Sequence, residues 1–149
     1  ALHEVTTAMC KKIAADGEGA TKLIECTVRG AKSKQVARTV AKSVVCSNLL
    51  KAAIFGADAN WGRVLCAIGY SGAAVDVNKI GVAFVSAAGK IEVCEDGRGI
   101  DFSEAAAKKI LFEKEIGIEI ELHDGNYSSV GWGCDLTYEY VHINGDYRS

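Results

Sequence analysis

The hydrophobic positions of this chain follow two periods, and each period predicts a different kind of element. Near the start, apolar side chains recur at intervals of three and four: Leu2, Val5, Met9 and Ile13. That period is typical of one face of an amphipathic helix, here over residues 2–15, which the glycines at positions 17 and 19 end. Apolar residues then alternate with polar ones from Ile24 to Val28, which predicts a half-buried strand that ends at Gly30.

Two further helices are predicted after this strand. Ser33 is a suitable N-cap for the first, whose apolar stripe has helical spacing: Val36, Ala37, Val40, Ala41 and Val44. Ser47 starts the second helix, which Gly56 ends. Residues 63–70 are mostly apolar and fit either a helix or a strand, and we favour a helix.

The second half of the chain reads mainly as strands. Residues 80–86 and 90–94 are predicted strands on either side of a turn at Ala88-Gly89, and residues 116–122 alternate clearly between apolar and polar positions. Between them, residues 103–113 predict a helix with three inward side chains: Ala106, Ile110 and Leu111. Residues 132–143 are predicted to form a last extended segment. This mixture of helices and strands, without an internal repeat, favours a layered α+β fold for residues 1–149.

Composition and charge exclude several classes of partner. The chain has 49% hydrophobic and 24% charged residues, which is typical of a soluble globular protein. Its net charge of −2 lacks the basic excess of a nucleic-acid-binding protein. No apolar run is long enough to cross a membrane, and no signal peptide opens the chain. We therefore expect a cytoplasmic protein with neither a nucleic-acid nor a membrane partner.

The cysteines and histidines do not form a recognisable metal or disulfide pattern. The six cysteines form no C-x-x-C pair and lie among apolar residues, so we expect reduced, buried thiols. The three histidines lack neighbouring ligands at metal-binding spacing, so we expect no metal.

The segment D-G-E-G-A-T-K, residues 16–22, is unlike an ordinary loop. Two glycines flank Glu18, and glycines allow a sharp turn and the close approach of a ligand. A carboxylate held there can accept hydrogen bonds from an ammonium group. The spacing and the helix-loop-strand order differ from those of a phosphate-binding loop. The alternative is a turn exposed to solvent, and the residues alone leave both interpretations open.

Two other segments share this ambiguity. In F-G-A-D-A-N-W-G-R, residues 55–63, Asp58 or Asn60 can fix a turn, while Trp61 belongs either to the core or to a site. The aromatic and amide-rich segment 132–149 offers Asn144 and Ser149 as donor and acceptor for a small polar ligand, or is an edge strand with a loose tail. No G-x-S-x-G elbow or suitably placed histidine indicates a catalytic nucleophile.

These segments, together with S-x-L-x-K-A-A at residues 47–53, G-Y-S-G at 69–72 and C-D-L-T-Y-E-Y-V-x-I-N-G-D-Y-R-S at 134–149, resemble one family in order and spacing. They are similar to the C-terminal part of the β chain of ornithine acetyltransferases, the glutamate N-acetyltransferases of arginine biosynthesis. The resemblance implies a sandwich fold of the DmpA and ornithine-acetyltransferase type, with mixed sheets and flanking helices. It also implies a precursor that cleaves itself into α and β chains, which assemble as α2β2.

The family's activity is acetyl transfer through an acyl-enzyme. An N-terminal threonine of the β chain takes the acetyl group from N-acetylornithine and passes it to glutamate. Some members also use acetyl-CoA as a co-substrate, and no bound cofactor is implied.

The resemblance assigns substrate binding to three residues. The family's ligand-binding glutamate falls on Glu18, its tail asparagine on Asn144, and its terminal threonine on Ser149, where serine keeps the hydroxyl. The family's nucleophilic threonine segment has no counterpart, since Thr6 and Thr7 do not match it. We therefore expect no catalytic residue here, and activity only with the α chain and the remaining β-chain segment. Two alternatives remain: a non-catalytic ligand-binding or assembly domain, and an aminopeptidase-like hydrolase.

Overall fold

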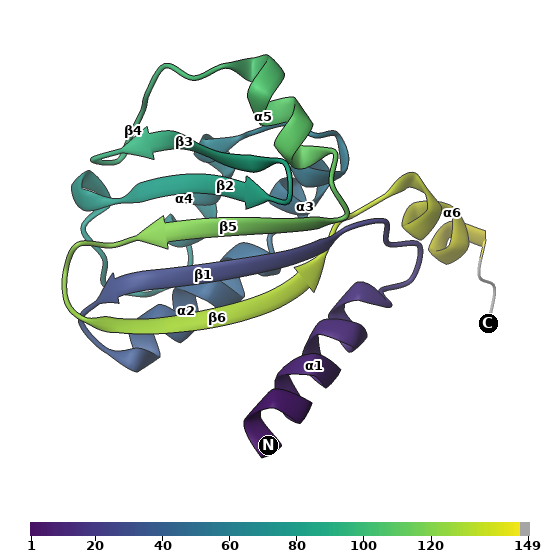
Figure 1. Cartoon of the computed structure of the whole chain (residues 1–149), viewed down its shortest axis with the longest axis horizontal. Helices are drawn as coiled ribbons and strands as arrows, with labels where there is room; N and C mark the ends of the chain where they lie inside the picture. Colours follow the sequence, from purple (N-terminus) through teal and green to yellow (C-terminus); the bar gives the residue numbers. More distant parts are fainter. Residues whose placement is uncertain (147–149) are drawn as a thin grey trace.

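A computed structural model describes residues 1–146 and shows a mixed six-stranded sheet (Figure 1). The strands are β1 (Leu23–Ala31), β2 (Gly81–Ser86), β3 (Gly89–Glu95), β4 (Arg98–Gly99), β5 (Glu115–Glu121) and β6 (Tyr127–Cys134). Their order across the sheet is β4-β3-β2-β5-β1-β6, with β1 and β5 parallel and the other neighbours antiparallel. Helices flank this sheet, so the predicted layered α+β fold is confirmed.

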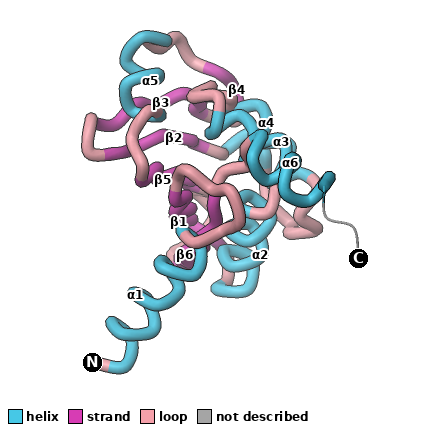
Figure 2. The backbone as a smooth tube through the Cα atoms, turned by 90° about the vertical axis from the view of Figure 1, so that its right-hand side faces the viewer, coloured by secondary structure: helices cyan, strands magenta, loops and turns pink. Residues whose placement is uncertain are grey.

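Three helices cover one face of the sheet: α2 (Lys34–Val45), α3 (Asn48–Phe55) and α4 (Trp61–Gly69) (Figure 2). Each begins at a side-chain cap, because Ser33, Ser47 and Asn60 accept a hydrogen bond from the backbone N–H three residues ahead. A short 3₁₀ turn, Val77–Lys79, precedes β2, and α5 (Glu104–Leu111) packs on β2 and β3.

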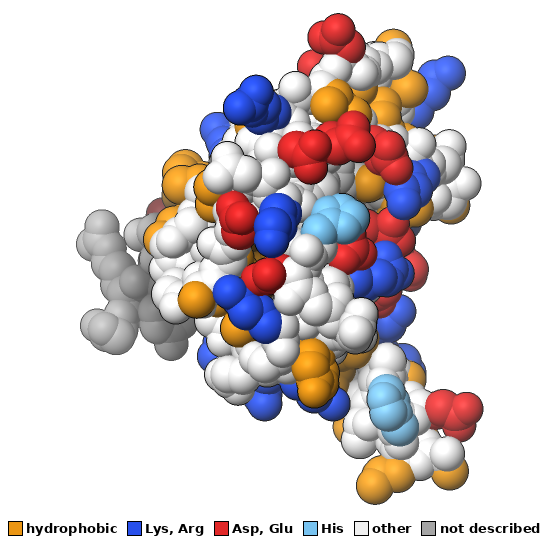
Figure 3. All heavy atoms as spheres, turned by 90° about the vertical axis from the view of Figure 1, so that its left-hand side faces the viewer, with side chains coloured by type: hydrophobic (Ala, Val, Ile, Leu, Met, Phe, Trp, Pro, Cys, Tyr) orange, Lys and Arg blue, Asp and Glu red, His pale blue; other side chains and the backbone are white. Residues whose placement is uncertain are grey.

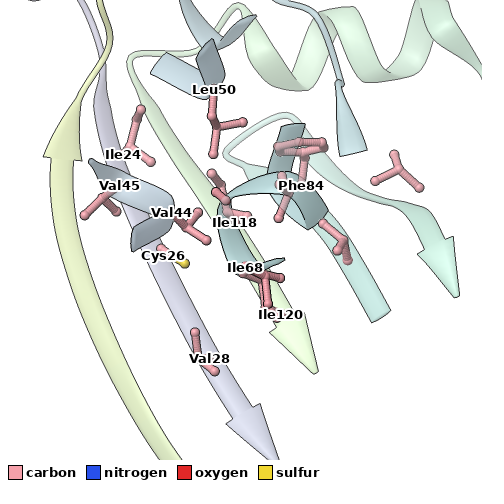
Figure 4. Close-up of a cluster of buried hydrophobic side chains, with 14 of the residues drawn as sticks. Ile24, Cys26, Val28, Val44, Val45, Leu50, Ile68, Phe84, Ile118 and Ile120 are labelled. Carbon is pink, nitrogen blue, oxygen red and sulfur yellow. The ribbon is translucent and has the colours of Figure 1, made fainter. Parts of the chain in front are cut away.

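The hydrophobic core lies between the sheet and α2–α4 (Figure 4). Every second residue of the two parallel strands points into it: Ile24, Cys26 and Val28 from β1, and Ile116, Ile118 and Ile120 from β5. Val44, Leu50 and Ile68 meet them from the three helices. The strand period of two and the helix period of 3.6 therefore converge on one core.

The two remaining helices lie outside this packed body. Helix α1 (Leu2–Ala15) lies on the side of the sheet opposite α2–α4 and contacts β1 and β6 (Figure 2). Helix α6 (Tyr138–Asp146) follows β6 at the end of the sheet where the α1–β1 loop also lies (Figure 1). Neither helix has a buried residue.

Most predicted elements are confirmed, and three expectations were wrong. Residues 132–143 are not one extended segment, because β6 ends at Cys134 and Thr137 caps a helix instead. In α5 the inward alanine is Ala107, one position after the predicted Ala106. The cysteines within residues 1–146 are free as expected, but only Cys26 and Cys94 are buried.

One hydrogen-bonded carboxylate attaches α1 to the sheet. The Lys11 Nζ atom lies 2.6 Å from Glu25 Oε2, and the Trp132 indole N–H donates to the same oxygen at 2.7 Å. Burial raises the pKa of Glu25, but the hydrogen bonds from Lys11 and Trp132 and the Lys11 charge outweigh it, so the pKa lies below its ordinary value of 4.5.

We expect this contact to open in acid. Folding lowers the pKa of Glu25, so the ionised carboxylate stabilises the folded state. This stabilisation is fully present above pH 4.5 and is lost as the pH falls through the lowered pKa of the folded protein. Fluorescence of Trp132 in a Trp61→Phe background, titrated from about pH 6 to about pH 3, should report the loss as a shift in emission. The Glu25→Gln variant should lack that transition. An identical transition in the variant would contradict the assignment.

Candidate functional site

The three unusual sequence segments converge at one end of the sheet. The loop of residues 16–22 leads from α1 into β1, residues 134–137 lead from β6 into α6, and Phe55 is the last residue of α3. The Phe55 and Tyr138 rings meet edge to face with centroids 5.4 Å apart. Positions more than a hundred residues apart in the sequence therefore form one surface.

Asp135 holds the loop of residues 16–22 in place. Its side chain is 3% exposed. One carboxylate oxygen accepts hydrogen bonds from the backbone N–H groups of Thr21 at 2.8 Å and Lys22 at 2.9 Å. The other accepts from the Thr21 hydroxyl at 2.5 Å. This carboxylate is thus a structural acceptor, with its oxygens occupied by the loop.

Lys22, the last residue of the motif, ties the same loop to two helices. Its ammonium group donates to the carbonyl oxygens of Ile54 and Leu111, both at 2.7 Å, at the C-terminal ends of α3 and α5. A positive charge is favourable at the negative end of a helix dipole. Burial lowers the pKa of Lys22, and the Asp135 charge partly opposes that effect. Lys22 therefore connects the loop of residues 16–22 to the C-terminal ends of α3 and α5.

The glycines of the motif allow α6 to pack against the loop. Gly19 has a φ of +66°, and a Cβ atom there would lie 2.7 Å from the Tyr140 backbone nitrogen. Thr137 makes the adjoining contact, since its hydroxyl donates to the Gly19 carbonyl at 2.6 Å and accepts from the Tyr140 N–H at 3.2 Å. The first turn of α6 is thereby capped and attached to the loop.

The structure brings Glu18 and Asn144 together. The Asn144 side-chain N–H₂ donates to Glu18 Oε2 at 2.7 Å and to the Tyr140 carbonyl at 2.9 Å. Both partners are acceptors, which places the amide nitrogen on their side and leaves the amide oxygen of Asn144 facing elsewhere. Among residues 1–146, Glu18 Oε1 also has no hydrogen-bond partner. The exposed pair thus presents two acceptor oxygens, which suits an ammonium group.

The third predicted binding residue, Ser149, lies outside the described residues. In the second segment the structural interpretation holds: Asn60 caps α4, and Trp61 packs against the core. Arg63 donates to the Leu49 carbonyl at 2.7 Å. Within residues 1–146, that segment contacts the candidate site through Phe55.

Sequence reasoning missed the three residues that hold the loop of residues 16–22 and α6 in place: Asp135, Thr137 and Lys22. The sequence gave no signal for them beyond their place in the quoted motifs, because their hydrogen-bond partners lie 114, 118 and up to 89 residues away. Within residues 1–146 no group of His, Cys, Asp and Glu side chains could hold a metal ion. No helix of that part of the chain has the length and hydrophobicity needed to cross a bilayer.

Comparison with known proteins decides the family. A model of the ArgJ family matches residues 1–149. The chain belongs to the ArgJ family. It is 54% identical to "Arginine biosynthesis bifunctional protein ArgJ 1" of Clostridium acetobutylicum over 149 residues, which are all of this chain and 36% of that protein. It is 46% identical to "Glutamate N-acetyltransferase" of Methanopyrus kandleri, again over its whole length and 38% of the relative.

A solved ArgJ structure has the same fold. The crystal structure of the "Arginine biosynthesis bifunctional protein argJ" of Bacillus halodurans superposes with a TM-score of 0.92 at 48% identity, covering 98% of this chain and 67% of the solved one. The membership of this family that the motifs indicated is therefore confirmed. The chain spans little more than a third of the length of the curated ArgJ relatives.

Proposed function

We propose that this chain is the amino-acid-binding part of an ArgJ-type glutamate N-acetyltransferase, which moves an acetyl group from N²-acetylornithine to glutamate. The observation that carries the proposal is the Glu18–Asn144 pair, whose hydrogen bond joins the two ends of the described chain. The names of the relatives support the reaction, since one is called a glutamate N-acetyltransferase and others are called arginine biosynthesis proteins.

In this proposal the chain binds and orients the substrate. The Glu18 carboxylate accepts hydrogen bonds from the side-chain ammonium of N-acetylornithine, and the Asn144 amide oxygen is a second acceptor. Ser149 supplies a hydroxyl to the same amino acid, as the resemblance implies. Because Asp135 and Lys22 fix the loop behind Glu18, the substrate is held in one orientation, which favours reaction at a nearby nucleophile.

The nucleophile belongs to the rest of the enzyme. A threonine hydroxyl on the remaining β-chain segment attacks the acetyl carbonyl, ornithine leaves, and the amino group of glutamate then takes the acetyl from the ester. The partners are that segment and the α chain, in a cytoplasmic α2β2 assembly. Acetyl-CoA is a candidate co-substrate, and no bound cofactor is required.

The test is an acetyl-transfer assay on the complete assembled protein. N-acetylornithine and glutamate should yield ornithine and N-acetylglutamate in equal amounts, measured by mass spectrometry. Release of free acetate at the same rate with and without glutamate would favour the hydrolase alternative. Binding of N-acetylornithine without turnover by the complete protein would favour a non-catalytic binding domain.

A further inference from the structure

Helix α1 turns its apolar face away from the body of the molecule. Four large hydrophobic side chains on this helix are exposed: Leu2 at 78%, Val5 at 56%, Met9 at 58% and Ile13 at 71%. Their spacing places them on one face, hereafter the outer face of α1. Figure 3 shows the helix protruding from the body with hydrophobic side chains on its surface. An amphipathic helix ordinarily buries this face, so the packing of α1 is inverted within residues 1–146.

The face of α1 that does meet the sheet is polar. Its partly buried positions are Thr7, Lys11 and Ala14, on the side roughly opposite the outer face. Lys11 reaches the Glu25 carboxylate that Trp132 also binds. Between this side of the helix and β6 lies a hollow of about 590 Å³, lined by residues that include His3, Cys10 and Trp132. The helix is thus held by an ion pair with its hydrophobic face outward.

The exposed outer face of α1 would be stabilised by contact with another apolar surface. Burying a large aliphatic side chain against another apolar surface is favourable relative to leaving it in water. Four such side chains in a row on one helix therefore favour association with another apolar surface.

Two of these helices packed together would be too small an interface for a stable dimer. A stable interface buries roughly 1,200–2,000 Å² in total. Two helices of 14 residues that meet through four apolar side chains each would bury less area than that. The part of the ArgJ protein that lies outside these residues offers a larger surface for the helix. The chain spans 36–38% of its curated relatives, and a third of the solved Bacillus halodurans chain lies beyond the matched part.

We propose that the outer face of α1 docks against an apolar surface on the part of the ArgJ protein that lies outside these 149 residues. Helix α1 ends at Ala15, and Glu18 follows within a single turn of chain. A part docked along α1 therefore approaches the Glu18–Asn144 pair at the C-terminal end of this helix. This inference rests on family membership and the packing of α1, and it holds whether or not the proposed acetyl transfer is found.

Photo-crosslinking in the complete ArgJ protein tests the inference. The photoreactive residue p-benzoylphenylalanine is placed at Met9 on the outer face, or at the exposed Glu4 on another side of the same helix as the control. After irradiation, mass spectrometry of peptides should find position 9 linked to a segment outside residues 1–149, and position 4 largely unlinked. A cross-link from position 9 to α1 of a second copy would overturn the proposal, and so would the absence of any cross-link.

A smaller probe covers the case in which the bulky residue disturbs the helix. With the exposed Cys10, Cys46 and Cys66 replaced by serine, Met9→Cys and Glu4→Cys are compared for the rate of maleimide labelling in the complete protein. Position 9 should react at least about tenfold more slowly than position 4, because the thiol is buried under the docked segment. Equal rates, whether fast or slow, would overturn a one-sided docking face.

Discussion

A complete ArgJ protein that carries Glu18→Ala is expected to bind N-acetylornithine and ornithine at least about tenfold more weakly than the unchanged protein, because one charge-assisted hydrogen bond contributes roughly 1.5–3 kcal/mol. The carboxylate is exposed, and one of its oxygens already accepts the Asn144 amide at 2.7 Å. The other oxygen is the acceptor proposed for the ligand's ammonium group. Isothermal titration calorimetry with each amino acid measures the loss directly.

The isosteric variant separates charge from shape. Glu18→Gln can keep the contact with Asn144 but removes the negative charge, so its affinity for ornithine should fall nearly as far as that of Glu18→Ala. Asp16→Asn is the matched control, since Asp16 is an exposed carboxylate two positions earlier on the same loop. It should leave affinity unchanged. If both Glu18 variants bound ornithine as tightly as the unchanged protein, Glu18 would not be the ammonium acceptor.

The contact between Glu18 and Asn144 also predicts that substitutions at these two residues have coupled effects on ligand affinity. Residues in direct contact show non-additive effects, with interaction energies of about 0.5–3 kcal/mol. Asn144→Ala removes both the amide oxygen offered to the ligand and the donor that orients Glu18. The double variant should therefore lose less affinity than the sum of the two single losses.

The regular elements of the core could be predicted from local pattern, whereas α6 could not. Apolar alternation marked β1 and β5, and Ser33 and Ser47 marked the starts of α2 and α3, because each signal lies within a few residues of the element it defines. Helix α6 lacks such a stripe, because its apolar side chains are spread around the helix instead of recurring on one face. It begins where Thr137 caps it while binding the Gly19 carbonyl, and that partner is 118 residues away.

The same distinction applies to the candidate site. Glu18 and Asn144 were assigned by family resemblance, but their hydrogen bond depends on β6 running antiparallel to β1 and returning the chain to its beginning. The outer face of α1 is a case in which local pattern predicted the element but not its contacts. Its period correctly predicts a helix, but a period does not say which surface covers the apolar side, and within residues 1–146 none does.

Asp135→Ala is expected to destabilise the fold by about 3–5 kcal/mol, which is large for a single substitution. The change leaves the N–H groups of Thr21 and Lys22 and the Thr21 hydroxyl without their acceptor, at a site where Asp135 is almost wholly buried. It also removes the negative charge that opposes the desolvation of Lys22. Urea denaturation followed by circular dichroism gives the difference in the free energy of unfolding.

Two companion variants define what Asp135 contributes. Asp135→Asn keeps an oxygen for the two backbone N–H groups and should therefore cost less, about 1–2 kcal/mol, mainly through the lost charge. Asp101→Ala, at an exposed position before α5, is the control and should stay within about 0.5 kcal/mol of the unchanged protein. Equal stability of Asp135→Ala and the control would mean that the loop of residues 16–22 keeps its conformation without this carboxylate. Because that loop carries Glu18, the order of stability should also be the order of ornithine affinity: the unchanged protein first, then Asp135→Asn, then Asp135→Ala.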